Sequence, residues 1–444
     1  MASSRTRPPE ADLVAHVGEV LQAAGIGRDD RLCLALSGGV DSSVLLEILA
    51  RQRPRIGFAL TAAHVNHGLS PHADAWCRFC EAACARLGVG LSIFRVEVAR
   101  DDPAGLEAAA RAVRLAALSG VSADWLVFAH HQDDQAETVL FRLLRGAGVL
   151  GAGAMKGCEA GALGRLRPLL AVRRASIEAF AAANGIAWVE DESNADPRFS
   201  RNFLRHKVFA PLEAEFPAAV PMLARATGHF QAAGELLDDL AAIDFETCGG
   251  DTLALERLLR LSDRRLCNLL RWMIRRANDA PPSSVRINEV VRQLRATAGA
   301  PACLALGAHA LTVYRGGVRL MRHTLAGHSS PWHGEASLTW GDGRIVIERQ
   351  AGAGLDQAAL SAAGSIVFTT RWSGLAMRLS LKRPRRTFKN LCQEAGVPAW
   401  RRDGLPVMQV DGEAVWIAGV GFAAEWCCPP DAAGVVPHWL PPHA

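Results

Sequence analysis

The first half of the chain alternates short apolar runs with longer segments in which apolar residues recur every three or four positions. The uninterrupted apolar runs cover residues 32–36, 58–65, 91–96 and 125–129. Such runs are typical of strands that are buried on both faces of a parallel sheet. Helical patterns separate or follow them at residues 40–51, 71–87, 105–119, 133–145 and 174–184. This alternation predicts a doubly wound α/β domain, which a short strand at 187–190 extends.

The pattern changes near residue 215. Helical periodicity continues to about residue 297, and Gly-punctuated strand patterns follow at 302–308, 311–314 and 318–322. Residues 323–332 are typical of a linker, and the remainder is strand-rich apart from a short helix at 388–395. We therefore predict an α/β domain with a mainly parallel sheet at 1–215, a mostly helical domain at 216–325 and a small α+β domain at 326–444. A length of 444 residues agrees with two or three domains.

Composition narrows the class of protein. Half of the residues are hydrophobic and 21% are charged, which is typical of a globular chain, and the net charge of +4 says little about partners. The eleven cysteines follow no regular spacing, and residues 1–30 lack a basic-then-apolar signal pattern. No stretch approaches the ~18 uninterrupted apolar residues of a membrane span. These features predict a cytoplasmic protein with reduced thiols and no membrane span.

The clearest chemical signal follows the first predicted strand. It is the segment Ser37-Gly38-Gly39-Val40-Asp41-Ser42-Ser43. Two glycines allow a tight turn, and backbone N–H groups would converge where the next helix begins, which is a site for phosphate. The alternative is a plain Gly-Gly turn before a serine-capped helix. The position at the carboxyl end of a strand, where open α/β sheets bind ligands, favours the phosphate site.

One residue of this segment does not suit an anion. The carboxylate of Asp41 would repel phosphates unless a cation lay between them, so it predicts a Mg²⁺ contact. The segment also lacks the lysine of a Walker A motif.

Further polar segments follow the other predicted strands and helices. They are residues 64–69 (HVNHGL), Glu107 with Arg111 and Arg114, residues 130–138 (HHQDDQAET), 145–148 (RGAG), 188–194 (WVEDESN) and Arg201-Asn202-x-x-Arg205. The string SGGVDSS resembles the PP-loop of ATP pyrophosphatases. Together with the other segments it is similar to the tRNA(Ile)-lysidine synthase family, strongly over about 210 residues and more weakly at 388–389 and 396–406. Leu115 and Ala152 depart from the family pattern, which puts no reacting group in doubt.

This resemblance implies an ATP-dependent ligase that joins free L-lysine to C2 of the wobble cytidine, position 34, of tRNA(Ile) with a CAU anticodon. The cytosine O2 would attack the α-phosphate of ATP and release pyrophosphate. The lysine amine would then attack C2 and expel AMP, giving lysidine and changing codon and amino-acid specificity from Met to Ile. ATP and Mg²⁺ are the implied cofactors, and a homodimer is compatible with the sequence. The alternatives are a PP-loop tRNA 2-thiolase and a non-catalytic tRNA-binding protein.

The resemblance also assigns roles to individual residues. The implied catalytic residues are Asp41, Arg111, His130 and Asp133, with Asp41 as the metal ligand. The implied ATP site comprises Ser37, Gly38, Gly39, Val40, Asp41, Ser42, Ser43 and His64. Asp134 and Glu137 would bind lysine. The implied tRNA contacts are Arg201, Asn202, Arg205, Lys389, Trp400 and Arg402.

Several of these residues also have plainer interpretations. Asp134 and Glu137 share one helix face, which suits an ammonium ligand, but the spacing equally fits a capping box, and both roles can coexist. The pair Arg111 and Arg114 would offset phosphate charge or lie on a solvated helix face. His130 and His131 would serve as acid–base or adenine-contacting groups, or hydrogen-bond locally.

Cysteines and basic residues bear on the alternatives. Cys77, Cys80 and Cys84 could hold a metal cluster, as in tRNA thiolases, but their helical spacing favours a buried face. Basic residues cluster at 198–207, 264–276 and 378–389, and Trp400 beside the last cluster could stack on a nucleotide. Each cluster alone is typical of a solvated face, and the three together favour tRNA.

Overall fold

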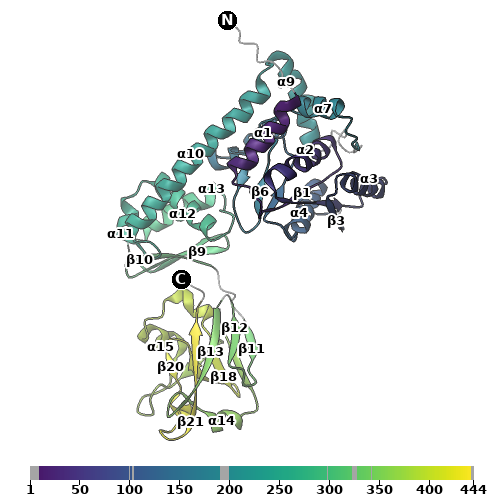
Figure 1. The fold of residues 1–444 in the computed structure, drawn as a ribbon. Helices are drawn as coiled ribbons and strands as arrows, with labels where there is room; N and C mark the ends of the chain where they lie inside the picture. The colour runs from purple at the N-terminus through teal and green to yellow at the C-terminus, as the bar shows by residue number, and fades with distance from the viewer. Residues whose placement is uncertain are drawn as a thin grey trace. The chain divides into compact units, whose positions relative to one another are not determined.

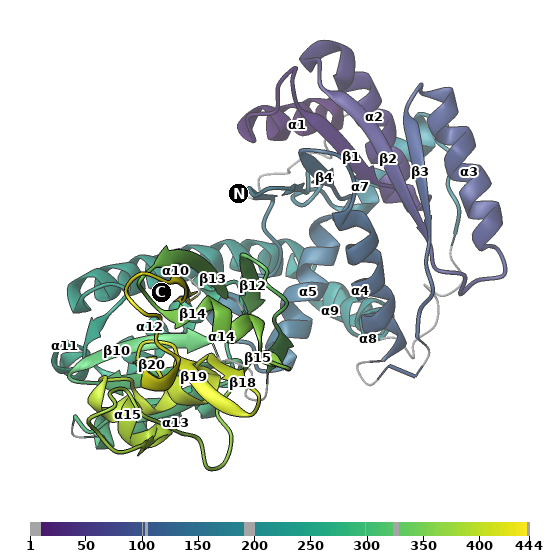
Figure 2. The ribbon, with the colours of Figure 1, turned by 90° about the horizontal axis from the view of Figure 1, so that it is seen from below.

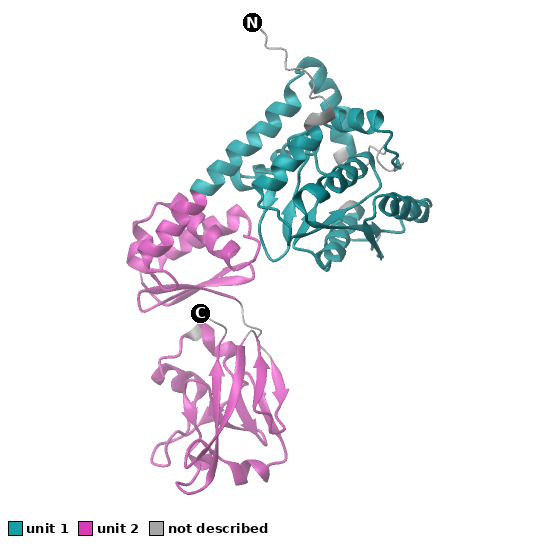
Figure 3. Cartoon of the chain, in the orientation of Figure 1, with its two compact units in different colours: residues 1–236 teal, residues 237–444 magenta. Residues whose placement is uncertain are grey.

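The computed structural model describes residues 10–99, 101–102, 105–190, 200–297, 299–322, 328–341 and 343–441. The chain divides into two compact units, residues 1–236 and 237–444 (Figure 3). None of the helices in the described part of the chain is long and apolar enough to span a membrane.

The first unit is built on a six-stranded sheet in the order β3-β2-β1-β4-β6-β5. Its strands are β1 (Arg31–Ala35), β2 (Ala59–Asn66), β3 (Gly90–Arg95), β4 (Trp125–Val127), β5 (Cys158–Glu159) and β6 (Gly164–Leu166). All pairs are parallel except β5 with β6. The predicted doubly wound, mainly parallel sheet is therefore confirmed. The order reverses between β1 and β4, and such a switch point is where open α/β sheets bind ligands (Figure 2).

Burial on both faces explains the apolar runs. In β1, Leu32 and Leu34 pack into the larger core together with helix α2, whereas Cys33 packs into a second core on the opposite face. A strand covered on both sides cannot alternate apolar and polar residues. The helices that pack into these two cores are α1 (Glu10–Ala23), α2 (Val40–Ile56), α3 (Ala73–Arg86), α4 (Leu106–Ser119) and α7 (Arg174–Ala183) (Figure 1). Helices α5 (Gln132–Leu144) and α6 (Val149–Ala152) also belong to this unit.

One local prediction in this unit is wrong, and two short strands were not predicted. Residues 187–190 form no strand; instead the Val189 N–H donates a single bond to the Gly38 carbonyl, 2.9 Å away, so this segment buttresses the loop after β1. The strands β5 and β6 were not predicted, because two or three residues that include Gly164 and Arg165 give no apolar run.

A chain of short helices follows and ends the first unit. It comprises α8 (Ser200–Phe203), the π-helix η2 (Leu204–Phe209), α9 (Ala210–Glu215) and the long α10 (Ala219–Cys248), which continues into the second unit. Leu204 and Phe209 of η2 pack with Ala136 of α5 in one small core. This packing fixes η2 against the helix that carries the predicted lysine ligands.

The second unit begins with helices on an antiparallel sheet. These are α11 (Leu255–Arg260), α12 (Asp263–Arg276) and α13 (Ser284–Ala296), with the sheet order β7-β10-β9-β8. The strands are β7 (Leu253–Ala254), β8 (Ala302–Leu306), β9 (His309–Tyr314) and β10 (Gly317–Arg322). Helices and sheet share one core, which confirms the mostly helical region and its trailing strands.

The C-terminal part is β-rich, as predicted, and has its own core. One sheet has the order β11-β15-β18-β19-β20 and another the order β12-β13-β21-β14. Their strands are β11 (Ser329–Pro331), β12 (Ser337–Trp340), β13 (Gly343–Ala351), β14 (Leu355–Asp356), β15 (Ile366–Thr369), β18 (Val407–Val410), β19 (Glu413–Ile417), β20 (Gly421–Phe422) and β21 (Ala433–Leu440). The remaining elements are α14 (Gln357–Ser361), β16 (Ala376–Met377), β17 (Arg386–Thr387), α15 (Phe388–Glu394), η3 (Ala399–Gly404) and η4 (Ala424–Trp426). The predicted linker is wrong where β11 forms, because Ser329–Pro331 pairs with β15; residues 323–327 lie outside the described part.

Candidate nucleotide-binding active site

The loop between β1 and α2 leaves the start of a helix open to a ligand. The first helical bond of α2 runs from the Ser43 N–H to the Gly39 carbonyl, 3.0 Å away. The three preceding N–H groups, Val40 to Ser42, therefore have no acceptor within the helix. Gly39 is the N-cap and offers no side chain to them. An uncapped helix N-terminus with its positive dipole end is suited to phosphate.

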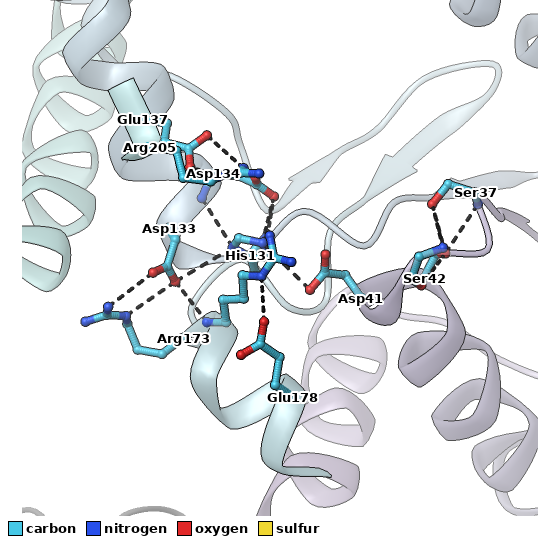
Figure 4. Close-up of polar contacts among 12 residues, drawn as sticks. Ser37, Asp41, Ser42, His131, Asp133, Asp134, Glu137, Arg173, Glu178 and Arg205 are labelled. Carbon is cyan, nitrogen blue, oxygen red and sulfur yellow. Dashed lines mark hydrogen bonds and ion pairs between the residues drawn. The ribbon is translucent and has the colours of Figure 1, made fainter. Parts of the chain in front are cut away.

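Serine hydroxyls hold the shape of this loop. The Ser42 hydroxyl oxygen accepts from the backbone N–H of Ser37 (3.3 Å) and Gly38 (3.2 Å), and the hydroxyl donates to the Gly39 carbonyl. The hydroxyl of Ser43 donates to the Gly38 carbonyl, 3.2 Å away. Figure 4 shows Ser37 and Ser42 turned toward each other. The two buried serines thus build the turn.

Gly38 is required by both conformation and space. Its φ of +89° lies in the region that glycine favours. A Cβ at this position would lie 2.9 Å from Val189 Cγ2 and 3.2 Å from Cys80 Sγ. The loop therefore fits tightly between α3 and the segment after α7.

Asp41 has the properties of a cation ligand. Its Oδ1 atom is buried and accepts no hydrogen bond from the described residues; His131 Nε2 lies 3.7 Å away. Burial raises the pKa of Asp41 above its usual value, although the charges of His131, Arg174 and Arg205 oppose this. A desolvated carboxylate oxygen beside a phosphate-binding helix end suits Mg²⁺.

His131 lies at the centre of the polar cluster (Figure 4). It is 1% exposed and caps α5: its Nδ1 accepts from the Asp134 N–H at 3.3 Å, and Asp134 Oδ2 accepts from the His131 N–H at 3.1 Å. A capping box is therefore present, but its members are His131 and Asp134, not Asp134 and Glu137 as the sequence suggested. Asp134 therefore occupies the third position of the helix, and Glu137, which has no part in the cap, contacts a different residue.

That partner is Arg205, from η2. The Arg205 guanidinium donates from Nε to Glu137 Oε1 (2.7 Å) and from Nη2 to Glu137 Oε2 (3.0 Å) and Asp134 Oδ1 (3.4 Å). Glu137 is buried, and burial raises its pKa despite the nearby guanidinium. For Asp134, burial is outweighed by His131, His130 and Arg205, which hold its pKa below the usual value. The two predicted lysine ligands thus converge on one cation.

Asp133 joins α5 to α7. Its carboxylate accepts from the Arg173 guanidinium (3.1 and 3.3 Å) and from the Arg174 backbone N–H (2.9 Å). Arg173 also reaches Glu213 of α9 at 2.8 Å. Asp133 is fully engaged in holding three helices together, and a catalytic role for it stays a prediction.

Two histidines lie near strand ends, His64 buried and His130 partly buried. His64 Nδ1 is 2.8 Å from the Leu36 carbonyl, so Nδ1 carries the proton and Nε2 is left as an acceptor. Burial lowers the pKa of His64. Burial, with the charges of Arg167, Arg114 and Arg111, lowers the pKa of His130 to about 3 even though Asp134 opposes it. His130 is therefore neutral at physiological pH and is placed to accept or donate a hydrogen bond, not to supply charge.

The predicted tRNA contacts are spread over both units. Asn202 is buried in α8, and the side chain of Arg201 lies outside the described set. In the second unit, Lys389 is exposed on α15, Trp400 meets the ring of Tyr314 edge-on at 5.7 Å, and Arg402 donates to the Val397 carbonyl at 2.9 and 3.1 Å.

The three cysteines of α3 are buried, which confirms the packing interpretation. Burial, the largest cause, raises the pKa of Cys80 to about 12 and that of Cys84 to about 11, so both are thiols. No group of three or more His, Cys, Asp or Glu among the described residues could hold a metal ion. The feature that would have favoured a thiolase is therefore part of the core.

Sequence reasoning missed three arginines. Arg173 and Arg174 begin α7 and reach the cluster only because the switch-point topology brings α7 beside α5. Arg167, just after β6, donates to Glu159 at 2.6 Å and adds positive charge near His130. Two adjacent arginines at the start of a predicted helix gave only a weak indication of a functional site, and nothing in the sequence around Arg167 indicated one.

A parallel sheet, an uncapped Gly-Gly loop at its switch point and an unsatisfied aspartate define the PP-loop class of ATP-binding proteins. Family models agree: a PP-loop domain matches residues 11–212, a TilS substrate binding domain 253–325 and a TilS substrate C-terminal domain 366–439. Proteins named tRNA(Ile)-lysidine synthase from Aromatoleum aromaticum and Azoarcus sp. are 56% and 52% identical to the chain. These alignments cover 95% and 98% of this chain and 100% and 97% of those proteins. The chain belongs to the tRNA(Ile)-lysidine synthase family.

A more distant solved structure, the U34-tRNA thiolase NcsA from Methanococcus maripaludis, is 18% identical with a TM-score of 0.42. It covers 49% of this chain and 78% of that one, and is too dissimilar to inform function.

Proposed function

We propose that this protein is a cytoplasmic ligase that joins L-lysine to C2 of the wobble cytidine of tRNA(Ile) at the expense of ATP. The main support is the full-length similarity to proteins named tRNA(Ile)-lysidine synthase, with 56% sequence identity over 95% of the chain in one of them. In this proposal the PP-loop domain binds ATP, and the two TilS substrate domains bind the tRNA.

The residues of the first unit have complementary parts in this proposal. The open N–H groups of Val40 to Ser42 would hold the phosphates of ATP. Asp41 would bind Mg²⁺, which would neutralise phosphate charge. The cytosine O2 attacks the α-phosphate, and the bond to pyrophosphate breaks. Lysine nitrogen then attacks C2, a proton leaves the amine, and the C2–O bond to AMP breaks. Arg111, whose charge acts on His130, would stabilise the developing charge, and His130 would orient the base.

Asp134 and Glu137 would hold an ammonium group of the lysine substrate. They form an anionic pair on α5, in which Glu137 is buried and Asp134 partly buried, next to His131, which in turn lies beside Asp41. We also propose the division into domains at 1–215, 216–325 and 326–444, with tRNA contacts in all three. A homodimer is part of this proposal, and sedimentation velocity would show it as a species of twice the mass of the chain.

The test is a lysine-incorporation assay with purified protein, ATP, Mg²⁺, labelled lysine and a tRNA(Ile) transcript with the CAU anticodon. Nucleoside mass spectrometry should show lysidine, with one AMP and one pyrophosphate per lysine. A transcript with uridine at position 34 is the matched control and should accept none. Nucleotide-independent tRNA binding without turnover would instead indicate a non-catalytic tRNA-binding protein, and sulfur in the product would indicate a thiolase.

A further inference from the structure

Arg205 occupies the place where the proposed function puts a substrate ammonium. Its guanidinium forks onto both carboxylate oxygens of Glu137 and reaches Asp134 (Figure 4). This arrangement satisfies two acidic side chains of which Glu137 is only 5% exposed. Removing one partner of such a pair leaves an uncompensated buried charge, so a cation beside these carboxylates is strongly favoured.

Arg205 and a substrate ammonium cannot both use these oxygens. An ammonium group needs several acceptors, and the Arg205 fork already engages both Glu137 oxygens and one oxygen of Asp134. A lysine that binds this pair must therefore displace the guanidinium. The structure thus shows the pair in a self-occupied form.

The surroundings of Arg205 allow it to leave. Its side chain is 27% exposed, unlike Glu137, so the guanidinium borders solvent. Its backbone belongs to a six-residue π-helix, a rare conformation that is frequent at functional sites. His206 and Lys207 follow it directly on the exposed side of the same helix. Phosphate binds guanidinium groups strongly and bidentately, so an RNA backbone at this basic segment would compete for Arg205.

We propose that Arg205 is an internal competitor that closes the lysine site until tRNA draws its guanidinium onto a phosphate. The inference rests on the proposed function and adds an order to it: tRNA binds first, and lysine binds tightly only afterwards. Arg205 acts here as a positioning residue through Asp134 and Glu137.

The experiment is equilibrium dialysis of labelled L-lysine against the full-length wild type and Arg205→Met, each with and without tRNA(Ile) transcript and without ATP. Wild type should bind lysine about 10-fold or more tightly when tRNA is present. Arg205→Met should bind lysine alone about as tightly as wild type does with tRNA, and tRNA should add little. Arg173→Met, which removes another paired arginine of the cluster, is the matched control and should not tighten lysine binding.

Two results would overturn the inference. Equal lysine affinity of wild type with and without tRNA would show that no competitor is displaced, and this result needs no variant. Weaker lysine binding by Arg205→Met would make Arg205 a ligand of the substrate carboxylate, provided that 1,5-diaminopentane, which lacks that carboxylate, binds the variant normally. Lysidine formation by wild type, measured in parallel, separates either failure from failure of the proposed function.

Discussion

At the scale of single residues, the site combines a tightly packed turn with a desolvated acid. Gly38 adopts a positive φ in a space too small for a Cβ, and Asp41 keeps an oxygen without a hydrogen bond. The buried carboxylate oxygen costs stability, as is common where binding requires preorganised groups.

Replacing Asp41 with Asn should therefore separate stability from function. Because burial raises the pKa of Asp41 above the usual 3.8, the folded protein holds its proton to a higher pH than the unfolded chain does. Metal-free stability should fall as pH rises from 3.8 through the raised pKa, a loss that Asp41→Asn lacks. At neutral pH the variant should be about 1 kcal/mol more stable and lose roughly 100-fold or more in ATP turnover. Urea unfolding at a series of pH values measures the stability, and pyrophosphate release measures the ATP turnover.

The control for this variant is Asp29→Asn, which changes an exposed aspartate and should alter neither property. If Asp41→Asn kept full turnover at every Mg²⁺ concentration, Asp41 would not be the metal ligand.

Gly38→Ala should destabilise the first unit by about 3 kcal/mol, since it combines a left-handed conformation with a clash against Val189 and Cys80. Gly25→Ala is a matched control: its φ of +74° is similar, but nothing lies within 4 Å of the added Cβ. It should cost only about 1 kcal/mol. Thermal unfolding gives both values, and equal losses would mean that the space around Gly38 does not matter.

At the scale of elements, the site depends on how α5, α7 and η2 meet at the carboxyl edge of the sheet. His131 begins α5, Asp133 joins α5 to α7, and Arg205 joins η2 to α5. Each helix end therefore contributes a charged group whose partner lies on another element, so the helices and the site form together.

The link between Asp133 and Arg173 predicts energetic coupling between α5 and α7. Asp133→Ala should cost about 2 kcal/mol, because it removes three hydrogen bonds to Arg173 and the Arg174 backbone. A double-mutant cycle with Arg173→Met should give a coupling of about 1 kcal/mol. Arg174→Ala is the control: among the described residues its side chain forms an ion pair only with half-exposed Glu178, so the substitution should cost under about 0.5 kcal/mol.

Urea unfolding measures all four proteins of the cycle. An Asp133→Ala variant of undiminished stability that makes no lysidine would instead support a catalytic role for Asp133.

At the scale of the whole molecule, the second unit presents basic side chains that differ in how far they are neutralised. Lys382, Arg383 and Lys389 are exposed and form no ion pair with any described residue. Arg378, Arg385 and Arg386 of the same stretch pair with Glu425, Glu413 and Glu394. Only the first set has charge left for a polyanion.

Removing Lys382, Arg383 and Lys389 together, each to Ala, should weaken tRNA binding and its dependence on salt. Each lost phosphate contact lowers the slope of log K against log salt by about 0.7 to 0.9, so the triple variant should lose about 2. The control triple, Arg378, Arg385 and Arg386 to Ala, removes the same charge from paired positions and should change the slope much less. Filter binding over a range of salt measures both, and identical slopes would place the tRNA surface elsewhere.

The sequence by itself determined the parallel sheet, the phosphate loop, the order of the three regions and the family. These features rest on local patterns: apolar runs, glycines at a turn, and a motif of consecutive residues such as Ser37 to Ser43. Their physical cause lies within a few positions of the chain, so the linear order carries them. The buried face of Cys77, Cys80 and Cys84 was predictable for the same reason.

The tertiary structure alone decided which residues meet. The strand at 187–190 was wrong because its backbone bonds to Gly38 instead of a neighbouring strand, and β6 was missed because its position in the sheet, not its composition, makes it a strand. Likewise, nothing local reveals that Arg205, 68 positions after Glu137, closes the carboxylate pair, or that Arg173 holds Asp133. Ion pairs between distant segments depend on the packing of whole helices, and that packing is a property of the folded chain.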